Sequence, residues 1–198
     1  MRETELKGVV PDLDVARRAL LDAGAHATFT GALIDWRYDT PDLRLRTRDE
    51  VLRVRVTRTY GGSERACLDF KGPTSYPDGY KVREEIGTDV QSAATIDAIL
   101  RGLGYVVCRE IEREVEVYAL DETVVRFERY PRMDVLCEVE GEPAGIERAI
   151  VRMGLDRSSF TVERLSDFAR RFEARTGQRA ALSARELAGD YTYRLDDA

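Results

Sequence analysis

The sequence is poor in the residues that most often bind transition metals. Its single histidine, His26, follows the first predicted helix and has no second histidine with which to share a metal. The three cysteines, Cys67, Cys108 and Cys137, lie far apart and form no CxxC pair, which argues against a zinc site and a disulfide framework. Any metal is therefore expected to be held by carboxylates, which favour a hard cation such as Mg²⁺ or Mn²⁺.

Long apolar runs are also absent. No stretch approaches the length needed to span a bilayer, and residues 1–30 carry no signal-peptide pattern. We therefore expect a cytoplasmic protein with no membrane partner. The net charge of −6 and the lack of any basic block argue against binding to duplex nucleic acid.

The composition is typical of a globular domain, with 43% hydrophobic and 34% charged residues in a chain of 198. We place this domain at residues 1–177. Residues 178–198 form a polar tail, in which a short helix is expected around residues 184–188. The composition leaves open whether the protein is a monomer or a homodimer.

Lysine is scarce, although basic residues are not. Of 31 basic residues only three are lysine, namely Lys7, Lys71 and Lys81. Because the chain otherwise uses arginine, a retained lysine indicates a position where a compact ammonium group is needed instead of a planar guanidinium. These three positions are therefore candidates for a functional role.

The chain alternates predicted strands and helices. Strands are expected at residues 2–10, 27–38, 50–58, 65–71, 80–86, 105–119, 122–129 and 134–140. Helices are expected to begin at Asp12 or Asp14 and near Ser92, and to span residues 143–153 and 162–176. Residues 44–48 look like a loop or an edge strand. This order predicts an α+β fold, with an antiparallel sheet and helices on its outside.

Charged side chains recur at every second position of the predicted strands. In "ETELK", Glu3, Glu5 and Lys7 share one face of the first strand. The pattern returns at Arg53 and Arg55, Asp69 and Lys71, Lys81, Arg83 and Glu85, Arg126 and Glu128, and Glu138 and Glu140. A flat sheet with one wet face would explain a few of these pairs, but their density favours a closed barrel with a polar lumen.

Such a lumen needs counterions. Arginine and lysine side chains that face one another would repel unless they held an anion, and the carboxylates among them would hold a divalent cation. A polyanion together with a metal is most simply a triphosphate with Mg²⁺ or Mn²⁺. Asp69 is either one of the lumen acids or a salt-bridge partner of Lys71.

At this point the sequence resembles the CYTH superfamily, the triphosphate tunnel metalloenzymes, which include class IV adenylyl cyclases, thiamine triphosphatases and inorganic triphosphatases. "ETELK" matches the family's E-x-E-x-K signature, and "RYDTPDLRL" (37–45) is similar to its Y-[FY]-D-T-P-[DE]-x-x-L segment. Further similar elements follow in the family's order: "LRVR" (52–55), "FKGP" (70–73), "KVREE" (81–85), "IEREVEVY" (111–118), "RFER" and "CEVEG" (126–141), and "ERLSDF" (163–168). The resemblance covers about residues 1–170.

The resemblance implies an eight-stranded antiparallel tunnel with helices packed outside. It implies metal binding by Glu3, Glu5, Glu128, Glu138 and Glu140. The basic residues that it implies for phosphate binding are Lys7, Arg53, Arg55, Lys71, Lys81, Arg83, Arg113 and Arg126. The candidates for catalysis are Glu5, Lys7 and Glu85.

The chain departs from the family's pattern at four positions. Arg113 stands where lysine is usual, Val115 at a second basic position, Glu128 where aspartate is common, and Phe168 in place of tyrosine. Trp36 is expected to pack under a helix, like its neighbour Tyr38, instead of stacking on a base.

Three functions remain open on the sequence alone. The first is a metal-dependent triphosphatase acting on tripolyphosphate, thiamine triphosphate or ATP. The second is an adenylyl cyclase of class IV, which would convert ATP to cyclic AMP and pyrophosphate, although no motif for an adenine pocket is found. The third is a polyphosphate-binding module without catalysis.

Overall fold

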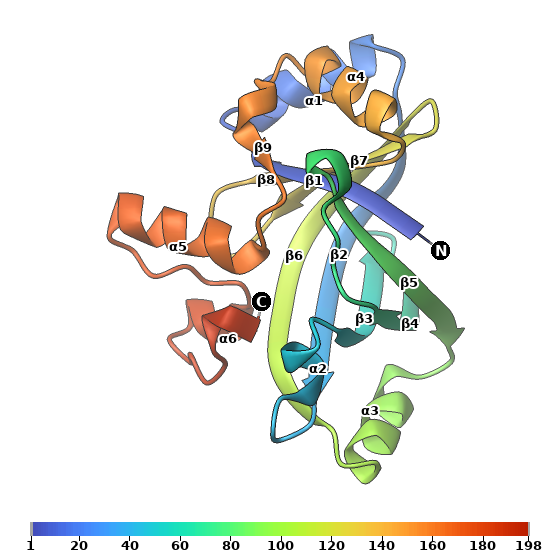
Figure 1. The fold of residues 1–198 in the computed structure, drawn as a ribbon, viewed down its shortest axis with the longest axis vertical. Helices are drawn as coiled ribbons and strands as arrows, with labels where there is room; N and C mark the ends of the chain where they lie inside the picture. Colours follow the sequence, from blue (N-terminus) through green and yellow to red (C-terminus); the bar gives the residue numbers. More distant parts are fainter. Residues whose placement is uncertain (1, 198) are drawn as a thin grey trace.

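The computed structural model describes residues 2–197 and consists of a closed antiparallel barrel with helices on its outside (Figure 1). Along the sheet the strands follow the order β5-β4-β3-β2-β6-β7-β8-β1, and a pairing between β5 and β1 closes the barrel. The strands are β1 (Arg2–Val9), β2 (His26–Asp39), β3 (Val51–Thr59), β4 (Glu64–Lys71), β5 (Lys81–Val90), β6 (Val106–Leu120), β7 (Thr123–Arg129) and β8 (Leu136–Glu140). The predicted eight-stranded barrel is confirmed.

A ninth strand, β9 (Phe160–Thr161), was not predicted. It pairs with Lys7 and Gly8 on the same edge of β1 that pairs with β5 nearer its start. The edge of β1 that β5 leaves uncovered is therefore covered by β9, which limits the exposure of unpaired backbone groups.

The apolar faces of the strands point outward, toward the helices. Leu6, Val125 and Val139 on the barrel wall pack with Leu20 and Ile146 in the largest buried cluster. These last two residues belong to α1 (Leu13–Asp22) and α4 (Pro143–Arg152). The hydrophobic core therefore lies between wall and helices, which leaves the charged strand faces for the barrel interior.

The helix α3 (Ala93–Gly102) covers the other side of the barrel. Its residue Leu100 packs with Tyr38 and Val54, and Trp36 lies against the same cluster. The Tyr38 hydroxyl also donates a hydrogen bond of 2.8 Å to Asp97. The prediction that both aromatic residues pack under a helix is confirmed.

Residues 44–48 do not form the loop or edge strand that was predicted. They contain a short helix, α2 (Arg44–Thr47). Its first turn is held by the Asp39 carboxylate, which accepts hydrogen bonds from the backbone N–H groups of Leu45 and Arg46, both at 2.9 Å. The prediction was wrong because this carboxylate satisfies N–H groups that an isolated four-residue helix leaves without acceptors.

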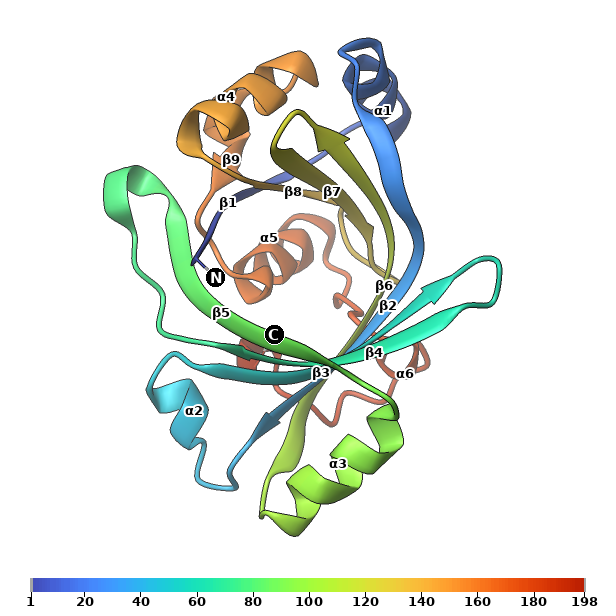
Figure 2. The same cartoon turned by 90° about the vertical axis from the view of Figure 1, so that its right-hand side faces the viewer.

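One end of the barrel is covered by the C-terminal part of the chain. Viewed through the barrel, α5 (Leu165–Thr176) lies across the opening between the strands (Figure 2). The tail then runs back over β6 and contains α6 (Ala184–Leu187), the short helix expected there. The proposed domain division at residue 177 stays a prediction. Among the residues described, no helix is long and apolar enough to cross a membrane.

Candidate functional site

The barrel encloses a cavity of about 390 Å³, a volume in the range of small-molecule binding sites. Its lining includes every residue that the sequence predicted for metal binding, phosphate binding or catalysis. These residues are Glu3, Glu5, Lys7, Arg53, Arg55, Lys71, Lys81, Arg83, Glu85, Arg113, Arg126, Glu128, Glu138 and Glu140. The cavity therefore brings all of them together, while their roles stay predictions.

Three of the predicted metal ligands form a cluster. Carboxylate oxygens of Glu3, Glu5 and Glu140 all lie within 4.8 Å of one another. Strand alternation places Glu3 and Glu5 on the inner face of β1, and the register of β1 with β8 sets Glu140 opposite Glu5. We call these three residues the acid cluster. Three oxygen donors at such spacing suit a hard divalent cation.

The surroundings of Glu140 fit a bound cation. One of its carboxylate oxygens is buried without a hydrogen-bond partner, although Arg126 lies 3.1 Å away outside hydrogen-bond geometry. Burial raises the pKa of Glu140 well above its usual value, and the nearby carboxylates of Glu138 and Glu3 act in the same direction. A cation at the acid cluster would contact the unpartnered oxygen of Glu140 and favour the ionised form of its carboxylate, so the residues present fit a metal.

The other two predicted ligands, Glu128 and Glu138, lie outside this cluster. Glu128 accepts a hydrogen bond of 2.8 Å from Arg113, and Lys7 lies 3.2 Å from its other oxygen. Glu138 is paired with Lys7 at 2.6 Å and with Arg126. Burial would raise the pKa of Glu128, but Lys7 and Arg113 outweigh it and lower the pKa to about 2. Both carboxylates are thus already neutralised by basic side chains.

A second acid–base pair lies beside the acid cluster, where Lys71 contacts Glu3 at 3.0 Å and also contacts Glu85. Burial and a hydrogen bond shared with Glu3 raise the pKa of Glu85 to about 7. The same hydrogen bond and Lys71 outweigh burial at Glu3 and lower its pKa to about 2. At neutral pH the Glu85 carboxyl can therefore both hold and release a proton, as a general acid or base must.

The sequence reasoning missed Asp35, which is 1% exposed. It lies among the lysine and arginine side chains that line the cavity, which we call the basic wall. Its carboxylate accepts two hydrogen bonds from Arg55, at 2.7 and 2.8 Å, and one from Arg113 at 3.0 Å, while Arg53 lies 3.6 Å away. Burial acts to raise the pKa of Asp35, but the three arginines outweigh it and hold the pKa well below its usual range. The available signal was its alternation with Arg37 along β2.

Two other expectations are resolved by the contacts. Asp69 lines the cavity and pairs with Arg53 at 2.8 Å, so it is a lumen acid whose partner is Arg53 and not Lys71. Phe168, which lacks the hydroxyl of the family pattern, is 2% exposed and packs with Ile111 and Tyr130 in an apolar cluster. Tyr130, in the same cluster, does carry a hydroxyl, which donates a hydrogen bond of 2.8 Å to Glu128.

Comparisons with known proteins agree with this architecture. The family model described as the CYTH domain matches residues 1–152. A comparison with curated proteins finds no match.

Several solved structures share the fold. A candidate adenylate cyclase from Vibrio parahaemolyticus is 18% identical and superposes with a TM-score of 0.70, covering 84% of this chain and 96% of its own. The PH1819 protein of Pyrococcus horikoshii is 21% identical, with a TM-score of 0.66 and coverages of 82% and 94%. HpAC1 from Hippeastrum, a candidate adenylyl cyclase with a dominant triphosphatase activity, is 17% identical, with a TM-score of 0.60 and coverages of 91% and 99%.

Proposed function

The chain belongs to the CYTH family, and from this premise we propose that it is a divalent-metal-dependent triphosphatase. The observation that carries the proposal is the placement of the acid cluster and the basic wall on one cavity. A linear triphosphate has anionic oxygens along its whole length, which suits a cavity lined by many cations. Its hydrolysis needs mainly positioning and charge neutralisation, and these are what such a lining supplies.

The acid cluster would hold the metal. A divalent cation bound there would supply Lewis-acid polarisation of a phosphoryl oxygen and charge neutralisation. The basic side chains of Lys7, Lys71 and Arg126 would bind and orient phosphate oxygens, exchanging their present carboxylate partners for the substrate. Glu85, whose pKa of about 7 suits proton transfer at neutral pH, would take the proton from the attacking water.

We favour hydrolysis over cyclisation of ATP because few apolar side chains line the cavity. A cyclase must also bind an adenine base, and among the described residues only Val51, Ile111 and Leu165 contribute aliphatic side chains to the cavity lining. The triphosphatase activity reported for HpAC1 supports the same choice for this fold. Cyclisation remains the alternative, and a binding module without catalysis the second alternative.

The test is product analysis with three substrates. The purified protein is incubated with Mg²⁺ or Mn²⁺ and, separately, with tripolyphosphate, ATP and thiamine triphosphate, and the products are resolved by phosphorus NMR. We expect orthophosphate release that is lost in Glu5→Gln and retained in Glu64→Gln, whose carboxylate is exposed on β4. Cyclic AMP with pyrophosphate would support the cyclase instead. Absence of any product would refute catalysis and leave the binding module.

A further inference from the structure

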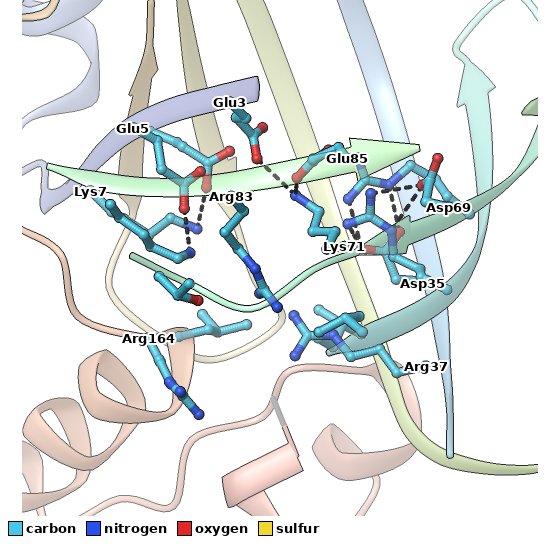
Figure 3. A pocket seen from close by; sticks show the side chains of 18 of the residues that line it. Glu3, Glu5, Lys7, Asp35, Arg37, Asp69, Lys71, Arg83, Glu85 and Arg164 are labelled. Atoms are coloured by element: carbon cyan, nitrogen blue, oxygen red, sulfur yellow. Dashed lines mark hydrogen bonds and ion pairs between the residues drawn. The ribbon is translucent and has the colours of Figure 1, made fainter. Parts of the chain in front are cut away.

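Lys7 is held between two carboxylates inside the barrel. It points into the cavity from the same strand, β1, as Glu3 and Glu5 (Figure 3). Its ammonium group lies 2.6 Å from Glu138 and 3.2 Å from Glu128. Burial acts to lower the pKa of Lys7, but these two carboxylates outweigh it and hold the pKa well above its usual value. The ammonium group is therefore charged and paired before a ligand enters.

A phosphate that binds Lys7 must take its ammonium group away from these carboxylates. Glu128 is 1% exposed, so bulk water does not reach it to replace a lost donor. A buried carboxylate oxygen that loses its last hydrogen-bond donor is left with the full cost of its desolvation. The ease with which Lys7 moves to a ligand therefore depends on which other groups donate to Glu128.

The Tyr130 hydroxyl donates to the same oxygen of Glu128 that Lys7 contacts. The hydrogen bond from Tyr130 to Oε2 is 2.8 Å long, and that from Lys7 is 3.2 Å long. Arg113 donates to the other oxygen, Oε1, at 2.8 Å. Burial and the charge of Glu128 raise the pKa of Tyr130, so the hydroxyl keeps its proton and remains a donor. When Lys7 leaves, each carboxylate oxygen thus keeps one donor.

The ring of Tyr130 is fixed by apolar contacts with three elements. Tyr130 is 8% exposed and packs with Ile111 of β6, Leu136 of β8 and Phe168 of α5. Its side chain also lines the cavity. The position of the hydroxyl therefore depends on the docking of α5 against the barrel, and the hydroxyl lies where Glu128 faces a ligand.

We propose that Tyr130 is a positioning residue for substrate binding, whose hydroxyl holds the Glu128 carboxylate while Lys7 moves from that carboxylate to a phosphate oxygen. The proposal rests on the proposed function, because it takes Lys7 as one of the groups that exchange a carboxylate partner for the substrate. It gives a role to an uncharged side chain that the alternating charges of the strands did not indicate.

The chain contains a matched tyrosine outside the cavity. Tyr118 follows Glu116 by two residues, as Tyr130 follows Glu128, and its hydroxyl donates to Glu116 at 2.9 Å. Arg17 donates two hydrogen bonds of 2.7 Å to the same carboxylate. Tyr118 is 5% exposed and packs in the large cluster between the barrel wall and the helices. The loss of one buried hydrogen bond from tyrosine to carboxylate can therefore be compared inside and outside the cavity.

The test is calorimetry with a non-hydrolysable probe, the methylene-bridged analogue of tripolyphosphate, in the presence of Mg²⁺. Tyr130→Phe removes one oxygen atom and keeps the ring in its apolar cluster. We expect this variant to bind the probe about tenfold more weakly, the effect of losing one hydrogen bond to a charged group. Tyr118→Phe should lose a similar amount of stability and bind the probe as the wild type does.

A second measurement distinguishes the positioning role from a general loosening of the site. In Lys7→Met no ammonium group leaves Glu128, so the addition of Tyr130→Phe should change the affinity for the probe by less than about twofold. A tyrosine that only stabilised the fold would weaken binding equally in both backgrounds. The rise of the melting temperature with probe concentration gives the same comparison where binding is too weak for calorimetry.

Wild-type affinity in Tyr130→Phe, or an equal loss of affinity in the Lys7→Met background, would overturn the proposal. A wild-type protein that does not bind the probe would overturn it as well. The outcome is separate from that of the proposed function. A loss confined to Tyr130→Phe, without any hydrolysis by the wild type, refutes the triphosphatase and keeps the positioning role, whereas hydrolysis with no loss in Tyr130→Phe does the reverse.

Discussion

At the scale of single residues, the cavity is an array of charges that are buried yet balanced. Asp35 is balanced by three arginines, and Glu128 by Arg113 and Lys7. Taking such groups out of water costs several kcal/mol for each ion, which good geometry offsets only when every partner is present. The stability of the folded protein is therefore sensitive to the loss of any one of these charges. A charged ligand that enters the cavity can also replace one member of an ion pair.

The first prediction concerns the pH dependence of stability without metal. The pKa of Glu128 is about 2 in the folded protein against an ordinary value of 4.5, so the folded state favours the ionised form. The stabilisation is fully present above pH 4.5 and is lost as the pH falls toward 2, by about 3 kcal/mol in total. We expect urea unfolding between pH 6 and 2 to show this loss and Glu128→Gln to reduce the dependence of the free energy of unfolding on pH.

The control for this prediction is Glu64→Gln, which removes a carboxylate that is 51% exposed and should leave this dependence unchanged. If Glu128→Gln loses stability with the same pH dependence as the wild type, protonation of Glu128 is not the cause of the acid sensitivity.

The residues that could be predicted from sequence are those whose role follows from spacing along one strand. Glu3, Glu5 and Lys7 alternate, so their common face was apparent before their partners were known. Asp35 could not be recognised in this way, because its role depends on arginines that β3 and β6 bring to it across the sheet. Arg164 was missed for a similar reason, since only the docking of α5 brings it to the cavity.

At the scale of elements, each strand has an apolar face and a charged face. The helices pack on the apolar face, and the charged face lines the barrel interior. Helical periodicity and capping residues located α1 and α3 well, since Asp12 and Ser92 accept hydrogen bonds from the first turns as expected. The helix α2 was not found, because it depends on the side chain of Asp39 from another element. Helical periodicity and capping residues therefore predict helices whose own sequence stabilises them. They miss a helix such as α2, which depends on a side chain from another element.

The second prediction concerns the attachment of α6 to the barrel. Glu186 is 3% exposed and binds Arg109, which is 0% exposed on β6. Replacing Glu186 by glutamine removes the carboxylate that pairs with Arg109 and leaves a buried guanidinium without this counter-charge. We expect the free energy of unfolding to fall by about 3 kcal/mol, as for other broken buried pairs. Denaturant titration at neutral pH measures this change in the free energy of unfolding.

A matched substitution on the same helix is Arg185→Gln. Its ion pair with Asp190 joins side chains that are 46% and 45% exposed, so its removal should cost no more than about 1 kcal/mol. The double variant Arg109→Met, Glu186→Leu should recover much of the loss, because it removes both buried charges. If Glu186→Gln were as stable as Arg185→Gln, the pair would not anchor the tail.

At the scale of the whole molecule, the closure of the barrel gathers charges of both signs around one cavity. The protein carries a net charge of −6, and the cavity is lined by eleven basic and thirteen acidic side chains. A polyanion inside the cavity can therefore pair with basic side chains at short range, where salt screens the interaction less, while a cation pairs with the carboxylates. Closure of the barrel, more than overall composition, makes a triphosphate a reasonable ligand.

The third prediction separates binding from catalysis on this basis. Because the basic wall is built from side chains and needs no metal to be cationic, tripolyphosphate should raise the melting temperature even in excess EDTA, while hydrolysis stops. A ligand present at about 100 times its dissociation constant adds about 2.7 kcal/mol to the free energy of unfolding, which a thermal scan detects readily. Sodium sulfate at equal ionic strength is the control for general salt effects. If tripolyphosphate changes the melting temperature only when Mg²⁺ is present, the metal supplies the affinity and the arginines only orient what it holds.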